Sequence, residues 1–153
     1  MGFRRLGAVL AALALLGTAA AGVADDGAGQ GGEPGERVSA RDLDGSNWRV
    51  EDIQGAGVVD RVLSSLGFRG DRIVGSGGCN RFQGGVGEED GRLVVGPLAS
   101  TRRACPTAVM DQEQRYLAAL ERAAYLERHG SLLHVLDADG VRLLRLAPLE
   151  GDA

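Results

Sequence analysis

The spacing of apolar residues divides this chain into short strands, one helix and a closing group of strands. Apolar and polar positions alternate over residues 48–53, which predicts a half-buried strand. The apolar runs 63–68 and 72–74 flank the turn-forming triplet Arg69-Gly70-Asp71 and predict a hairpin, and the run 92–98 predicts a further strand. These segments indicate strands that pair in an antiparallel sheet.

From Thr107 the hydrophobic period lengthens to that of a helix. The apolar face consists of Met110, Leu117, Leu120 and Ala124, with Tyr116 and Ala123 beside it, and the outward face consists of Asp111, Gln112, Arg115, Glu121 and Arg122. Pro106 suits a first helical turn, and Thr107 can cap the helix. The pattern predicts one amphipathic helix that packs against the sheet.

Three more apolar segments follow the helix and predict a three-stranded meander over residues 125–128, 131–136 and 141–146. Trp48 is the only tryptophan and is expected to anchor the core. The fold class is therefore α+β, with a small, curved, barrel-like antiparallel sheet packed against one main helix.

The first 24 residues have the pattern of a secretory signal peptide. Arg4 and Arg5 precede an apolar run, and small residues permit cleavage after Ala21 or Ala24, with Ala24 preferred. An uncleaved anchor and twin-arginine export remain alternatives. Residues 25–36 are expected to be a flexible, acidic, Gly-rich linker, and residues 37–153 one extracytoplasmic domain, periplasmic or secreted and monomeric.

The charge of the mature chain limits its partners. Loss of Arg4 and Arg5 leaves 15 basic against 21 acidic residues, a net charge of −6. This excess of acid argues against nucleic acid and anionic membrane surfaces as partners. All basic residues are arginines, so chemistry that needs a lysine is excluded.

The two cysteines, Cys79 and Cys105, are an even count in a chain expected to be exported, which favours a disulfide. Two buried free cysteines and a redox-active pair are the alternatives. With His129 and His134 they lack the spacing of a zinc finger, and the glycines after Val74 lack the features of a phosphate-binding loop. We expect no metal, no cofactor and no catalytic residue.

Two segments resemble a known family. Residues 75–84, Gly-Ser-Gly-Gly-Cys-Asn-Arg-Phe-Gln-Gly, are similar to the Gly-Cys-Asn-x-Phe-x-Gly signature of the META domain, also called the heat-shock-protein HslJ-like domain. Residues 101–106, followed by Glu113, resemble its Thr-x-x-x-Cys element and helix. The opening Leu43, Gly45 and Trp48 extend the resemblance, which covers nearly all of residues 41–148.

The resemblance implies a small exported domain, linked in some members to stress response, with no established catalytic residues. It also marks possible binding residues in the signature loops, namely Asn80, Arg81, Phe82, Thr101, Arg102 and Glu113. Arg81 could pair with Glu113 or Asp111 inside the fold, or be displayed to a ligand. The expected function is non-enzymatic binding of a protein or envelope component, and the alternative is a thiol-dependent enzyme or hydrolase that uses Cys79.

Overall fold

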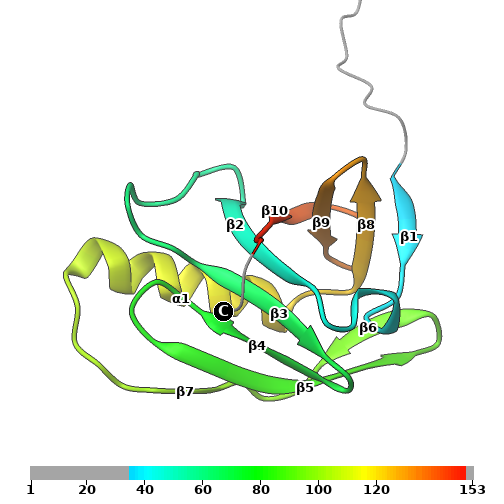
Figure 1. Cartoon of the computed structure of the whole chain (residues 1–153), viewed down its shortest axis with the longest axis horizontal. Coiled ribbons are helices and arrows are strands. Elements are labelled where there is room, and N and C mark those ends of the chain that lie inside the picture. The colour runs from blue at the N-terminus through cyan, green and yellow to red at the C-terminus, as the bar shows by residue number, and fades with distance from the viewer. Residues whose placement is uncertain (1–34, 151–153) are drawn as a thin grey trace, which may run out of the picture. The chain divides into compact units, whose positions relative to one another are not determined.

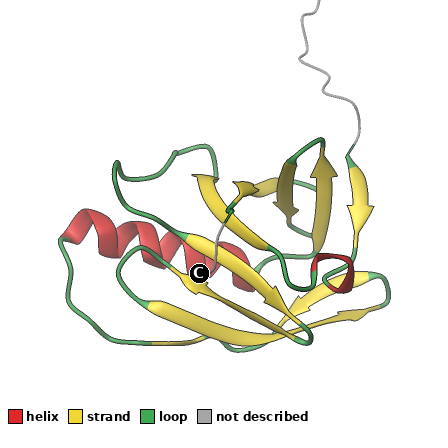
Figure 2. Cartoon of the chain, viewed as in Figure 1, coloured by secondary structure: helices red, strands yellow, loops and turns green. Residues whose placement is uncertain are grey.

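The computed structural model describes residues 35–150, so the predicted signal peptide and nearly all of the predicted linker lie outside the described residues. The described chain forms ten strands, one α-helix and one short 3-10 helix (Figures 1 and 2). The strands are β1 (Glu36–Val38), β2 (Asn47–Ile53), β3 (Ser65–Arg69), β4 (Arg72–Ser76), β5 (Arg81–Glu89), β6 (Arg92–Val95), β7 (Ala99–Ser100), β8 (Tyr125–His129), β9 (Leu132–Leu136) and β10 (Arg142–Pro148). The helices are η1 (Arg41–Leu43) and α1 (Thr107–Glu121).

All described strands belong to one antiparallel sheet, in the order β1-β8-β9-β10-β2-β3-β4-β5-β6, with β7 paired to the first part of β5. The predicted β3–β4 hairpin and the closing β8-β9-β10 meander are confirmed, as is the α+β class. The predicted barrel-like curvature is wrong, because the sheet is open. Its edge strands β1 and β6 have only three and four residues, and within the sheet each pairs on one side alone.

The core lies between α1 and the sheet, where α1 packs against β2 and β10. The Tyr116 ring meets Phe82 of β5 edge-on, with ring centroids 5.6 Å apart, and its hydroxyl donates to the Ser65 carbonyl at 3.0 Å. Trp48 is 3% exposed, and its indole N–H donates to the Ser46 hydroxyl at 2.7 Å. The expected core anchor is confirmed.

The buried face of α1 differs from the predicted one. It consists of Gln112, Glu113, Tyr116, Ala119 and Leu120. Gln112 was expected outside but is fully buried, because its amide bonds to groups of the β2–β3 loop. Met110 is 37% exposed, and Ala124 lies beyond the helix end at Glu121. Thr107 makes no side-chain cap, and Pro106 takes the N-cap position.

Strand β5 was not predicted, although it begins at Arg81, within the signature segment 75–84. Its inward positions are Phe82, Gly84 and Val86, and its outward positions are Arg81, Gln83 and glycines. The alternation is that of a half-buried strand, but glycine at both inward and outward positions weakens the hydrophobic pattern.

Candidate functional site

A disulfide joins the two signature segments. Cys79 lies in the turn between β4 and β5, and Cys105 lies just before α1; their Cα atoms are 6.1 Å apart. The predicted disulfide is confirmed, and it suggests an oxidising compartment. A closed loop of this size contributes about 3–4 kcal/mol by the chain-entropy model.

The carboxylate of Glu113, on α1, lies at the centre of the signature segments. It accepts the backbone N–H groups of Cys79 at 3.3 Å and Asn80 at 2.6 Å, and the Asn80 side-chain amide at 2.7 Å. Glu113 is 6% exposed and Asn80 3%, so both groups depend on these bonds for their polar partners. Gly77 makes this approach possible, because a Cβ there would lie 2.4 Å from the Glu113 side chain.

The amide of Asn80 is fixed in orientation by its other partners. Its oxygen accepts the Thr101 hydroxyl at 2.9 Å and the Arg103 backbone N–H at 2.7 Å, while its nitrogen faces Glu113. One asparagine therefore ties the β4–β5 turn, the segment after β7 and α1 together.

A second buried polar network lies beside the first on α1. Gln112 donates to the Ser64 hydroxyl at 3.1 Å and accepts the backbone N–H of Val59. The Ser64 hydroxyl in turn donates to the Gly77 carbonyl at 2.9 Å. The β2–β3 loop is thereby held against both the helix and the signature turn.

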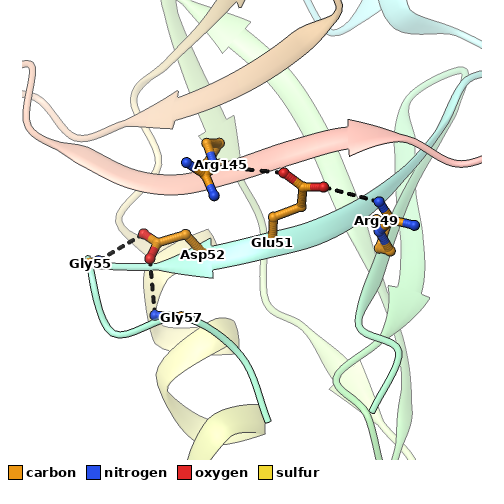
Figure 3. Close-up of polar contacts among 6 residues, drawn as sticks. All are labelled: Arg49, Glu51, Asp52, Gly55, Gly57 and Arg145. Carbon is orange, nitrogen blue, oxygen red and sulfur yellow. Dashed lines mark hydrogen bonds and ion pairs between the residues drawn. The ribbon is translucent and has the colours of Figure 1, made fainter. Parts of the chain in front are cut away.

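The first residues of the β2–β3 loop are held by Asp52, near the end of β2 (Figure 3). The Asp52 carboxylate accepts the backbone N–H groups of Gly55 at 2.8 Å and Gly57 at 3.0 Å. Burial alone would raise the pKa of Asp52, but these two N–H groups, together with the positive charges of Arg142 and Arg145, bring its pKa below the usual range. Beside it, Glu51 lies 3.0 Å from Arg49 and 3.7 Å from Arg145.

A groove of about 620 Å³ opens beside the signature segments, along β3, β4, β5 and β7. Residues with backbone or side-chain atoms on its surface include Leu63, Gly67, Val74, Arg81, Gln83, Ser100 and Thr101. Phe82 points to α1, so its neighbours Arg81 and Gln83 point to the opposite face of the sheet. The groove therefore lies mainly on the face turned away from the helix.

A sequence model of the META domain matches residues 41–148. The chain belongs to the META domain family. The resemblance seen in the signature segments is thereby confirmed. Among curated proteins, none matches this sequence.

Three solved structures share the META-domain fold of this chain. An NMR structure of a protein from Burkholderia xenovorans is 23% identical, with a TM-score of 0.59, over 78% of this chain and 92% of that one. A second NMR structure is 24% identical, with a TM-score of 0.57, over 72% and 94% of the two chains. A crystal structure of a DUF4847 family protein from Bacteroides vulgatus is 12% identical, with a TM-score of 0.53, over 73% and 98%. At these identities the likeness concerns the fold.

The residues predicted as the META signature site fall into two groups. Asn80, Phe82 and Glu113 are buried and serve as internal contacts. Arg81, Thr101 and Arg102 are exposed, and Thr101 both holds Asn80 and lines the groove. Of the two roles considered for Arg81, pairing with Glu113 or Asp111 is not found, since among the described ion pairs and hydrogen bonds its guanidinium has neither partner.

Sequence reasoning missed Gln112, Ser64 and Leu63. The first two are polar residues that satisfy each other in the core, and a hydrophobicity pattern assigns polar residues to the surface. Leu63 is 51% exposed although it begins an apolar run, and it borders the groove. An exposed leucine becomes recognisable as part of a site only when the groove beside it is known.

His129 and His134 lie on neighbouring strands, with ring centroids 4.1 Å apart. Burial, together with the nearby positive charges of His129, Arg142 and Arg145, lowers the pKa of His134 to about 4. Within residues 35–150, no group of three or more His, Cys, Asp or Glu side chains is arranged to hold a metal ion. Over the same range, no helix is long and apolar enough to cross a membrane.

Proposed function

We propose that this META domain protein is a non-enzymatic, exported binding protein, and that it holds a protein or envelope component in the groove beside its signature segments. The observation that carries the proposal is the groove itself. Its volume of about 620 Å³ lies in the range of about 300–1,000 Å³ that is usual for ligand sites. Some members of the family are linked to stress response, and we assign this chain to stress tolerance outside the cytoplasm, periplasmic or secreted.

The rigidity of the surrounding structure supports a binding role. The disulfide, the Glu113–Asn80 contacts and the Gln112–Ser64 contacts fix the segments that border the groove. A pre-formed site loses less conformational entropy when its ligand binds. The buried signature residues thus act as a scaffold for the exposed ones.

The alternative, a thiol-dependent enzyme, requires a free nucleophilic sulfur at Cys79. In the structure Cys79 is bonded to Cys105, so its sulfur is not available as a thiolate. Thiol titration of the native protein is expected to detect no thiol before reduction and two afterwards. One reactive thiol before reduction would favour the enzyme.

A site-specific photocrosslinker tests the binding role in the exporting organism. We place the crosslinking amino acid at Gln83, which is exposed and lines the groove, and as a control at Arg41, which is exposed on η1 outside the groove lining. An adduct that forms from position 83 but not from position 41 is the expected result. Equal labelling from both positions, or none from position 83, would contradict a groove-bound partner.

The same preparation tests the export prediction. The intact mass of the native protein is expected to correspond to a chain that begins at Asp25. Membrane-bound material that retains residues 1–24 would contradict cleavage.

A further inference from the structure

We propose that the groove takes an extended peptide segment of a partner protein, and that a side-chain carboxylate of this peptide pairs with Arg81. This inference rests on the proposed binding function and specifies its ligand. It is carried by three features of the groove: the sign of its charge, the held backbone of its one charged lining residue, and the apolar surface that also lines it.

The charge of the groove is opposite to that of the protein. Of the described residues that line it, Arg81 alone carries a charge and none is acidic. The whole chain nevertheless has a net charge of −4. A carboxylate that enters the groove therefore meets a cation and no acidic lining residue, which gives it electrostatic complementarity.

The backbone at Arg81 is held on both sides, while its guanidinium is exposed. The Arg81 N–H donates to the Thr101 hydroxyl at 3.2 Å, and the Thr101 N–H donates to the Arg81 carbonyl at 3.0 Å. The preceding residue, Asn80, is fixed by Glu113. Because the backbone of Arg81 is already held, its guanidinium can form a bidentate pair with a carboxylate at little cost in backbone ordering.

Apolar residues border part of the groove. Val74 and Ala99 line it together with the half-exposed Leu63. Gly67 also lines it, and a Cβ at this position would meet the side-chain oxygen of Asn47 at 2.9 Å and both the Arg69 guanidinium and the Val74 side chain at 3.3 Å. The absence of a side chain at Gly67 makes room for the contact between Arg69 and Asn47. The apolar surface for a side chain of the ligand is that of Leu63, Val74 and Ala99.

The composition of the groove favours a peptide over other anionic polymers. A nucleic acid or an anionic membrane surface is held by several cations at once, whereas this groove has one among its described residues. The amide of Gln83 carries both a donor and an acceptor, which suit the C=O and N–H groups of a peptide backbone. One carboxylate, one apolar side chain and a short extended backbone match these features together.

Two pools of synthetic pentapeptides test the proposal against the folded mature protein. Both pools are capped at each end and carry random Ala, Leu, Val, Ser or Gly around a central residue, which is Glu in one pool and Gln in the other. The backbone amide resonances of Gly67, Arg81, Gln83 and Thr101 report binding. Arg81→Gln removes the cation, Arg81→Lys keeps the charge without the bidentate geometry, and Arg41→Gln is the matched control.

We expect the Glu pool to shift the groove resonances, and the Gln pool to bind at least tenfold more weakly. Arg81→Gln should weaken binding of the Glu pool at least tenfold and Arg81→Lys by less, while Arg41→Gln leaves it unchanged. Equal binding of both pools, or unchanged binding to Arg81→Gln, would overturn the carboxylate contact while the groove still binds. No shift with either pool would overturn the peptide ligand, and the crosslink from position 83 independently decides whether the proposed function stands.

Discussion

Swapping the carboxylate of Glu113 and the amide of Asn80 tests most directly whether the hydrogen bond between these two side chains stabilises the fold. In the native protein a carboxylate oxygen of Glu113 faces the amino group of Asn80 at 2.7 Å. Glu113→Gln can keep its oxygen toward the two backbone N–H groups, but it then presents an amino group to the amino group of Asn80. Asn80 cannot simply rotate its amide, because its oxygen already accepts from Thr101 and Arg103.

The expected losses follow from these contacts. Glu113→Gln removes a charge-assisted hydrogen bond and leaves buried N–H groups unpaired, which costs about 2–4 kcal/mol. Asn80→Asp places two buried carboxylates in contact and costs about 3 kcal/mol or more. Either loss is a large part of the ~5–15 kcal/mol that stabilises a domain of this kind.

The double variant Glu113→Gln/Asn80→Asp restores the pairing with the polarity reversed. One oxygen of the new carboxylate at position 80 accepts from the new amide at position 113, and the other still accepts from Thr101 and Arg103. The double variant should therefore lie within about 1–2 kcal/mol of the native protein, with a coupling energy of at least about 2 kcal/mol.

Urea denaturation at pH 7, followed by the fluorescence of Trp48, measures all four free energies of unfolding. Glu121→Gln, at the exposed end of the same helix, is the control and should change stability by less than about 0.5 kcal/mol. Additive losses in the double variant, or a loss below about 0.5 kcal/mol for Glu113→Gln, would refute the direct contact.

Three further predictions concern the disulfide, the core and pH. Cys79→Ser should lower the free energy of unfolding by about 2–5 kcal/mol, and adding Cys105→Ser should lower it little further; free thiols on the unreduced protein would contradict this. Trp48→Ala should cost about 3–5 kcal/mol in denaturant melts, and a loss under about 1 kcal/mol would show that Trp48 does not anchor the core. The pKa of His134 is lowered to about 4 in the folded protein, so as the pH falls, His134 is protonated in the unfolded chain at a higher pH than in the folded one. The stability present above pH ~6.5 therefore decreases as the pH falls toward ~4. The loss is about 1–2 kcal/mol after allowance for solvent screening of the partly exposed ring, and a melting temperature of His134→Gln with the same pH dependence would contradict it.

The sequence predicted the elements whose signals are local. The β3–β4 hairpin has a glycine turn between two apolar runs, and the closing meander has turn residues between three such runs. The helix was found at its correct start because its period differs from that of the strands. In each case a few neighbouring residues contain the whole pattern.

The parts that the sequence did not predict depend on contacts between distant segments. Gln112 and Ser64 are 48 positions apart and hydrogen-bond in the core, so neither residue alone indicates that it is buried. The open sheet was missed for a related reason. Whether the edge strands β1 and β6 meet depends on the lengths and partners of strands at both ends of the domain.

In the candidate site, too, local signals in the sequence predicted some features and contacts between distant segments determine the others. The family motif located the segments that contain Asn80, Arg81 and Thr101, and the cysteine count indicated the disulfide, but neither signal separates buried signature residues from displayed ones. The structure makes that separation, since Asn80 and Glu113 use their polar groups on each other while Arg81, the first residue of β5, is exposed and lines the groove. A variant at Asn80 or Glu113 is therefore expected to change stability first, and a variant at Arg81 to change binding at unchanged stability. These two readouts distinguish the scaffold of this META domain from its proposed binding surface.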